Sequence, residues 1–305
     1  MLSPNKIAQI AQISSILEAS GYPKPGNVHR THDFQDMVFE DFLISGIVIG
    51  DAVREATSEV LKINPQIKSD EAFLGKYILK AVKETDEWIA NNTNLGIIML
   101  LIPIACSGAI SNNLTELQSN VGMLMENTNS LDAVSLYKAI GIAKAGGMGS
   151  QDEFDVTSIQ AQKELISKNQ TMYDVLKISA SWDSLADELT SKMPITFNIG
   201  FKTFSNLKKD YALNISTVLT FLTILSNVPD TLISRKYGEE KAKEVSNLSK
   251  ELLRFDDYAS IDFKNKLIEF DDFLFENRLN PGTTADLTAA SIMINYLNDF
   301  YENIL

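Results

Sequence analysis

The sequence contains very little cysteine and histidine for its length. Its 305 residues include one cysteine, Cys106, and two histidines. A single cysteine cannot form an internal disulfide, so a reducing compartment such as the cytoplasm is expected. His29 and His32 are three positions apart and the cysteine is distant from both, so the sequence does not indicate a zinc site. It also lacks a Gly-x-Ser-x-Gly segment and a cysteine–histidine nucleophile pair.

Long apolar runs and an excess of positive charge are missing as well. The longest apolar run, 97–106, is about ten residues long and contains Pro103, which is too short to cross a bilayer. The first residues lack the apolar core of a signal peptide. The net charge of −13 argues against a nucleic-acid surface, because such binding depends largely on neutralising phosphates. We therefore expect a cytoplasmic protein without a nucleic-acid or membrane partner.

The apolar residues that are present recur with helical spacing nearly throughout the chain. Residues 195–197 and 217–223 are rich in β-branched side chains, but no alternating pattern supports a sheet. We expect one all-α domain over 1–305, a multi-helix bundle with buried central helices and an active site formed by polar loops at helix ends. The helices are expected over about 4–20, 36–61, 69–90, from 95 onward, 130–145, 171–189, 197–207, 213–225, 230–253, 261–275 and 285–304.

A stiff polar loop, 23–37, separates the first two expected helices. Its prolines restrict the backbone, and its cations, Lys24 and Arg30, lie near the carboxylates of Asp33 and Asp36. Cations beside carboxylates are suited to a phosphate and a divalent metal ion. We expect the stiff loop to hold both cations in place, and we expect Lys24→Ala and Arg30→Ala to weaken ATP binding while leaving the fold intact. The alternative, which stays open, is an ordinary turn in which the carboxylates cap the next helix.

Four other polar junctions have the same character, each lying at a helix end between apolar segments. They are residues 92–96, 146–155, 230–238 and 280–286. Each also has a simpler explanation, namely a helix cap, a flexible acidic loop or a turn between helices. We predict that the five junctions converge on one pocket, because helix ends can meet at one end of a bundle.

Taken in order, these junctions resemble the triphosphoribosyl-dephospho-coenzyme A synthases, which make the prosthetic-group precursor of citrate lyase and malonate decarboxylase. The resemblance is carried by Pro23-Lys24-Pro25-Gly26 through Arg30, Asp36-Met37 with Phe39 and Ser45, Asn92-Thr93 with Gly96, Asp230-Thr231 with Arg235 and Gly238, and Asn280-Pro281-Gly282 with Ala285-Asp286-Leu287.

The chain departs from the family pattern at several positions. Asn94-Leu95 replaces the usual histidine-lysine, Asn27-Val28-His29-Arg30 replaces leucine-valine-aspartate-arginine, and Thr284 replaces serine. These differences resemble an archaeal-type branch of the family. They leave the acceptor substrate open.

The resemblance implies that ATP donates its triphosphoribosyl group to the 2′-hydroxyl of 3′-dephospho-CoA and that adenine leaves. Mg²⁺ is expected with ATP, held by Asp33, Asp36, Asp230 and Asp286. The catalytic candidates are Glu153, Asp155 and His32. Nucleotide binding is assigned to Lys24, Gly26, Arg30, Asn92, Thr93, Asn94, Gly96, Thr231, Arg235, Asn280, Gly282 and Thr283. The alternatives are a nucleotide-dependent glycosyltransferase or hydrolase with a different acceptor and a non-catalytic nucleotide-binding protein. A homodimer is one candidate oligomeric state.

Overall fold

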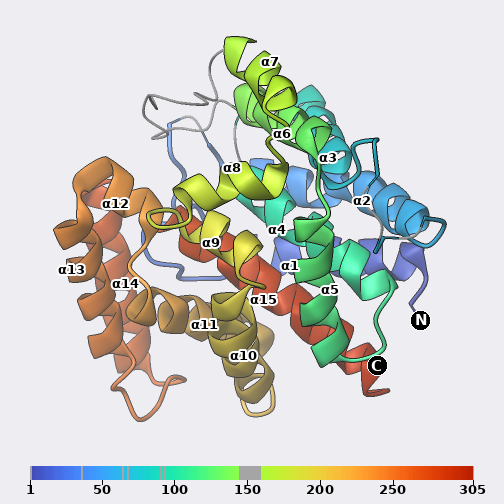
Figure 1. The fold of residues 1–305 in the computed structure, drawn as a ribbon. Coiled ribbons are helices and arrows are strands. Elements are labelled where there is room, and N and C mark those ends of the chain that lie inside the picture. Colours follow the sequence, from blue (N-terminus) through green and yellow to red (C-terminus); the bar gives the residue numbers. More distant parts are fainter. Residues whose placement is uncertain are drawn as a thin grey trace.

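Helices account for almost all regular structure in the part of the chain that the structure describes (Figure 1). The computed structural model describes residues 2–35, 37–63, 65–66, 69–89, 91, 94–143 and 159–304. Within these ranges the only extended pairing is an isolated bridge between His29 and His32. The predicted all-α fold class is therefore confirmed.

The first nine helices cover the N-terminal two thirds of the chain. They are α1 (Pro4–Ala19), α2 (Phe39–Val60), α3 (Leu74–Trp88), α4 (Leu95–Ala109), α5 (Leu114–Glu126), α6 (Ser130–Ala143), α7 (Ile159–Ser167), α8 (Met172–Ser179) and α9 (Ser184–Thr190). A π-helix, η1 (Thr196–Phe201), leads directly into the remainder. These are α10 (Lys202–Leu207), α11 (Leu213–Asn227), α12 (Thr231–Tyr237), α13 (Glu239–Leu252), α14 (Ile261–Glu276) and α15 (Gly282–Tyr301).

Local capping residues explain several of the helix starts. Ser3 caps α1 by accepting a hydrogen bond from Lys6 N at 3.3 Å, and Pro4 occupies the first turn. Thr171 and Asp174 form a reciprocal capping box at the start of α8, as the sequence predicts. These contacts need only neighbouring residues, so they are readable from sequence.

Two apolar helices, α4 and α15, form the centre of the molecule. α15 crosses the middle of the fold (Figure 1) and packs against α1, α4, α11 and η1. Nearly every residue of α4 is buried, including Pro103, which confirms the expected buried helix starting at residue 95. A helix surrounded by neighbours on all sides has no polar face to present, and this explains its uniform apolar sequence.

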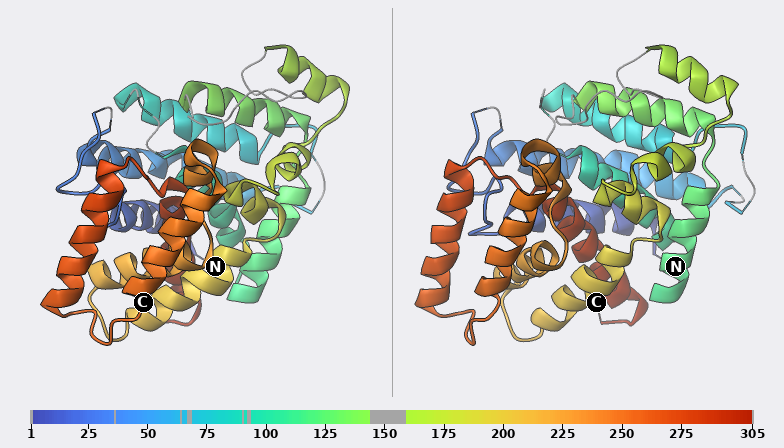
Figure 2. Two further views of the ribbon diagram at one scale, coloured as in Figure 1. Left: turned by 90° about the vertical axis from the view of Figure 1, so that its left-hand side faces the viewer. Right: turned by 60° about the vertical axis from the view of Figure 1, so that its left-hand side comes forward.

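Apolar side chains form two clusters, and α11 and α15 contribute to both. The larger cluster centres on α1–α6 and α15, and the smaller one on α11–α14. Figure 2 shows α13 and α14 on one side of the molecule, with the loop after α1 beside the end of α14. Among the described residues no single helix is both long and apolar enough to span a membrane. Taken together, α11 and α12 are long and apolar enough, but the pair is bent by 53° at its junction.

Three expectations about the helices are wrong. The long helix expected over 230–253 is divided into α12 and α13 by Gly238, whose φ of 92° lies outside the range of a right-handed helix. α5 was not expected at all. The second and third helices begin later than expected, at Phe39 and Leu74. Segments 195–197 and 217–223 are helical, because burial among helices outweighs their weak β-propensity.

Candidate functional site

Four helix ends meet at a cluster of charged residues that we call the helix-end site. It consists of the C-terminal end of α1 and the N-terminal ends of α4, α12 and α15. Its residues are Glu18, Lys24, Gly96, Asp183, Asp230, Arg235 and Asp286. The helix N-termini matter here because their free amide groups and dipoles favour negative charge.

Asp230 joins the start of α12 to the start of α15. Its Oδ1 accepts hydrogen bonds from Leu232 N at 2.9 Å and Ile233 N at 3.1 Å, which caps α12. Its Oδ2 accepts from both the amide and the hydroxyl of Thr284 at 2.8 Å. Burial raises the pKa of this carboxyl, and these hydrogen bonds oppose the shift. Because four donors occupy both oxygens of Asp230, the geometry favours a structural role, in which Asp230 joins α12 to α15, over the expected metal-binding role.

A second contact between the same helices is made by threonine hydroxyls. Thr231 Oγ1 donates a hydrogen bond to Thr283 Oγ1 at 3.1 Å, and Thr231 Oγ1 also accepts one from Ser184 N at 3.4 Å. Gly282 lies in the same turn, where a Cβ atom would come within 2.9 Å of the Leu232 side chain. The fourth and fifth sequence junctions, 230–238 and 280–286, are therefore in direct contact.

Asp286 lies against the first turn of α4. A Cβ atom at Gly96 would lie 2.5 Å from Asp286 Cγ, so only glycine allows this approach. Burial raises the pKa of Asp286 well above its usual range, and the negative charges of Glu18, Asp230 and Asp183 raise it further. Arg235 opposes this shift. Asp286 is therefore a buried carboxyl with three other carboxylates close enough to raise its pKa.

The Lys24 side chain is fully buried, although it belongs to a polar loop. It forms an ion pair with Glu18 and donates a hydrogen bond to the Glu18 carbonyl oxygen at 2.9 Å. Burial raises the pKa of Glu18, and Lys24 lowers it. This burial argues against the expectation that Lys24→Ala leaves the fold intact, since the change would leave the buried Glu18 carboxylate without its partner.

Arg235 is held on the face of α12 that was expected from its spacing to Thr231. Its guanidinium forms an ion pair with Asp183 Oδ2 at 2.9 Å, and both side chains are mostly buried. Asp183 also caps α9 by accepting from Leu185 N at 3.0 Å. Among the described residues, Arg235 Nε has no hydrogen-bond partner. One donor of the guanidinium therefore remains for a ligand.

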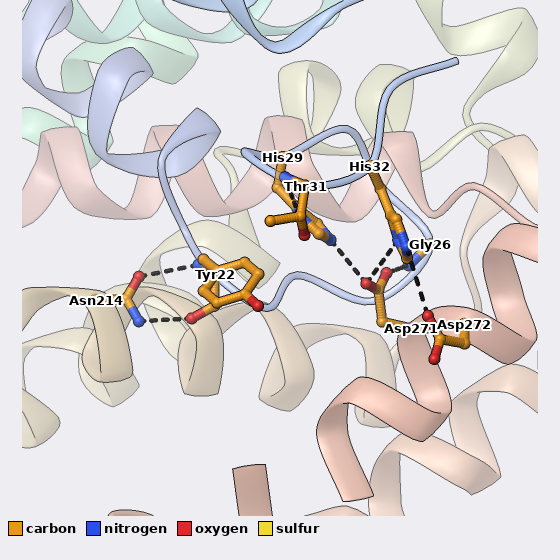
Figure 3. A network of polar contacts seen from close by, with 8 residues as sticks. All are labelled: Tyr22, Gly26, His29, Thr31, His32, Asn214, Asp271 and Asp272. Atoms are coloured by element: carbon orange, nitrogen blue, oxygen red, sulfur yellow. Dashed lines mark hydrogen bonds and ion pairs between the residues drawn. The ribbon is translucent and has the colours of Figure 1, made fainter. Parts of the chain in front are cut away.

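The loop after α1 is tied to the C-terminal part of the chain (Figure 3). Gly26 N donates to Asp271 Oδ1 at 2.9 Å, and Asn27 Nδ2 donates to Asn280 Oδ1 at 2.9 Å. Gly26 has a φ of 72°, and a Cβ atom there would lie 2.7 Å from Leu274 Cβ. The opening junction and the last junction thus meet, although Asn27 and Asn280 are 253 positions apart.

The other predicted residues of this loop lie at its outer part. Arg30 is exposed and its guanidinium lies 5.7 Å from the Phe39 ring, as expected for a surface cation. Asp33 is exposed and accepts from Phe39 N at 2.8 Å, so it acts as a cap for α2, which is the alternative that the sequence left open. Both ring nitrogens of His32 face the carboxylates of Asp271 and Asp272, so we do not retain His32 as a catalytic base.

Five predicted site residues lie outside the described residues. They are Asp36, Asn92, Thr93, Glu153 and Asp155. The neighbouring Asn94 precedes α4 and is buried, and its Nδ2 has no hydrogen-bond partner among the described residues. It lines a narrow pocket between α3, α4 and α6 with Val82, Asp86 and Ala143. An unpaired buried amide is consistent with the ligand-binding role assigned to it.

Sequence analysis missed several charged residues that the structure places at these contacts. Glu18 follows the buried face of α1 at the spacing of Ala11 and Ser14, and Asp271 occupies an apolar position of α14 between Leu267 and Leu274. A carboxylate at a helical position otherwise reserved for apolar residues is a signal that it has a buried partner. Asp183, next to Trp182, gave no comparable signal.

Comparison with known proteins agrees with this arrangement of motifs. Residues 4–304 match the model of the CitG family, described as ATP:dephospho-CoA triphosphoribosyl transferase. A protein of Malonomonas rubra named "Probable 2-(5''-triphosphoribosyl)-3'-dephosphocoenzyme-A synthase" is 22% identical over 304 aligned positions, covering 96% of this chain and 88% of that protein.

A solved structure supports the fold independently. It comes from Archaeoglobus fulgidus, is provisionally named a triphosphoribosyl-dephospho-CoA synthase, and superposes with a TM-score of 0.65 at 21% identity. The match covers 84% of this chain and 98% of that one. Since the family model spans nearly the whole sequence, the chain belongs to the ATP:dephospho-CoA triphosphoribosyl transferase family.

Proposed function

We propose that this protein is a transferase that moves the triphosphoribosyl group of ATP to the 2′-hydroxyl of 3′-dephospho-CoA and releases adenine. Family membership over residues 4–304 supports this activity. The structural observation that carries it is the position of Asp286, which contacts Gly96 and lies among Glu18, Asp183 and Asp230. These residues come from different helix ends, and a purely structural role does not require so many carboxylates in one place.

The reaction sets three physical requirements. The attacking hydroxyl must lose a proton, the departing adenine must be helped to leave, and the triphosphate charge must be neutralised. Positive charge also develops at C1′ of the ribose as the bond to adenine breaks, and nearby carboxylates stabilise such a centre. The crowded carboxylates of the helix-end site suit this last task, because their negative charge is already oriented when the substrate arrives.

The charge balance of the helix-end site fits a divalent cation. Within the described part of the chain, the carboxylates of Glu18, Asp183, Asp230 and Asp286 have only Lys24 and Arg235 as cationic partners. Burial raises the pKa of Asp286 most and the neighbouring carboxylates raise it further, so the charged form of Asp286 is unfavourable without a counter-ion. Mg²⁺ brought by ATP would bind at Asp286 and neutralise both this carboxylate and the triphosphate oxygens.

The residues that bind phosphate and accept the proton remain to be assigned. Arg30 and the free Nε of Arg235 are proposed to bind phosphate oxygens, since charge-assisted hydrogen bonds to phosphate are strong. Glu153 or Asp155 is proposed to accept the proton of the attacking hydroxyl. We also propose a cytoplasmic location, where ATP is plentiful and the Cys106 thiol stays reduced.

The decisive test is adenine release from ATP in the presence of Mg²⁺ and 3′-dephospho-CoA. Wild type and Asp286→Asn should be compared, with Asp262→Asn, an exposed residue of α14, as the matched control. We expect release by wild type and the control, and a large loss in Asp286→Asn. Release only with another acceptor would indicate a different glycosyl transfer. ATP binding without any release would indicate a non-catalytic nucleotide-binding protein.

A further inference from the structure

The two histidines of the chain converge on one carboxylate of α14 (Figure 3). His29 Nε2 and His32 Nδ1 each lie 2.8 Å from Asp271 Oδ2. These three atoms all lie within 4.8 Å of one another. Ligands of a tetrahedral metal ion with bonds of about 2.0 Å are roughly 3.3 Å apart, so small side-chain movements would admit an ion.

The two histidines contact Asp271 in different ways. The contact from His29 has the geometry of a hydrogen bond, whereas His32 Nδ1 is buried and has no hydrogen-bond partner among the described residues despite its short distance to Asp271 Oδ2. A buried polar atom without a partner calls for an explanation. His32 Nδ1 and Asp271 Oδ2 are close to each other but misaligned for a hydrogen bond. This is the arrangement of two ligand atoms that both point toward one metal ion.

Each of the three side chains has its other polar atom held by a neighbour. Asp271 Oδ1 accepts from Gly26 N at 2.9 Å, which leaves Oδ2 to face the histidines. His32 Nε2 lies 3.5 Å from Asp272 Oδ1, and His29 Nδ1 lies 3.4 Å from Thr31 Oγ1. Metal-binding histidines commonly place their second nitrogen against a carboxylate or another oxygen in this way, and it fixes the ring orientation.

Packing also holds the imidazole rings before any ion binds. Phe275 stacks on His32 with ring centroids 4.4 Å apart, and Tyr22 meets His29 edge-on at 5.4 Å. The backbones of His29 and His32 exchange hydrogen bonds of 3.2 and 3.1 Å. A preorganised set of ligands loses little conformational entropy when it binds an ion.

We propose that His29, His32 and Asp271 bind one divalent transition-metal ion, with Zn²⁺ as the best match, and that this ion fastens the loop after α1 to α14. Imidazole and carboxylate ligands suit Zn²⁺, whereas Mg²⁺ and Ca²⁺ prefer oxygen alone. The 23% exposure of His32 allows water to complete the coordination. These ligands differ from the residues proposed above to bind Mg²⁺, and the sequence did not indicate the set because Asp271 is 242 positions from His29.

The composition of the chain makes the proposal easy to test. The protein has only two histidines, and its one cysteine is fully buried in α4. Protein labelled with ¹⁵N only at histidine therefore gives signals from only four ring nitrogens. Titration with Zn²⁺ should shift His29 Nε2 and His32 Nδ1 together and saturate at one equivalent. Mg²⁺ at the same concentration should leave both unchanged.

Variants and a stability measurement provide the controls. Zn²⁺ should raise the melting temperature of wild type, because an ion that binds only the folded state stabilises it. His32→Gln and Asp271→Asn should lose this effect, whereas Asp262→Asn on the same helix should keep it. If either ligand variant fails to fold, the wild-type nitrogen shifts decide alone. Ring nitrogens that respond to pH but not to Zn²⁺ would overturn the proposal and identify a hydrogen-bonded histidine–aspartate cluster.

Discussion

Replacing Gly96 by alanine should disable the helix-end site without unfolding the protein. The new Cβ atom would lie 2.5 Å from Asp286 Cγ, whereas carbon atoms in contact are about 3.5 Å apart. The Asp286 side chain must therefore move by about 1 Å or rotate away. A displacement of this size in a catalytic group costs about a hundredfold in rate, or about 2.7 kcal/mol of transition-state stabilisation.

The effect of this substitution on stability should be small. Burial raises the pKa of Asp286, yet the side chain is not fully enclosed and can rotate away from a new Cβ atom. Alanine is also better suited to a helix than glycine by about 1 kcal/mol. Gly141→Ala in α6 is the matched control, because no described residue lies within 4 Å of a Cβ atom there. It should gain about 0.5–1 kcal/mol of stability and keep full activity.

Adenine release and urea unfolding together test the argument. Gly96→Ala should lose about a hundredfold in kcat/KM while its free energy of unfolding stays within about 1 kcal/mol of wild type. Combining it with Asp286→Asn should cost little more than the larger single loss, because both changes act on the same carboxylate. Activity within about threefold of wild type, or losses that simply add, would refute the proposed role of Asp286.

Three further predictions concern Glu188, a buried residue of α9 that accepts a hydrogen bond from Thr196 N at 2.9 Å, the capping residue Asp230, and two glycines with positive φ. Burial raises the pKa of Glu188 to about 7, so the folded protein keeps a proton that the unfolded chain releases near pH 4.5. Relative to Glu188→Gln, the unfolding free energy of wild type should therefore fall by about 3 kcal/mol as pH rises from 4.5 to 7. Urea-unfolding free energies of the two proteins that change in parallel with pH would contradict this. Asp230→Asn turns an amide donor toward the buried Thr284 N–H, and urea unfolding should show a loss of about 1–3 kcal/mol. Gly238 has φ 92° and ψ 157°, a region essentially restricted to glycine, so Gly238→Ala should cost about 1–3 kcal/mol of backbone strain. Gly26→Ala also clashes with α14 and should cost more in the same assay; equal losses would show that the clash is relieved.

Much of the fold could be predicted from the sequence because helix formation depends on neighbouring residues. The apolar segment starting at Leu95 indicated a buried helix, and Ser3 and Thr171 marked helix starts. The break at Gly238 was missed, because a glycine inside a helical pattern can be tolerated or can end a helix, and packing decides between them. Asp33 could cap a helix or bind a ligand, and the sequence left both open.

The sequence by itself determined the helical class, the family and the polar character of the junctions. These follow from composition, spacing and motif order along the chain. Only the tertiary structure decided which charged groups are partners. Lys24 is buried in an ion pair with Glu18, and both oxygens of Asp230 accept hydrogen bonds from the first turns of two helices. Asp271 contacts the histidines although it lies near the other end of the chain. Such pairings depend on how helix ends pack, and the cost of burying a charge then selects the partner that lies within reach.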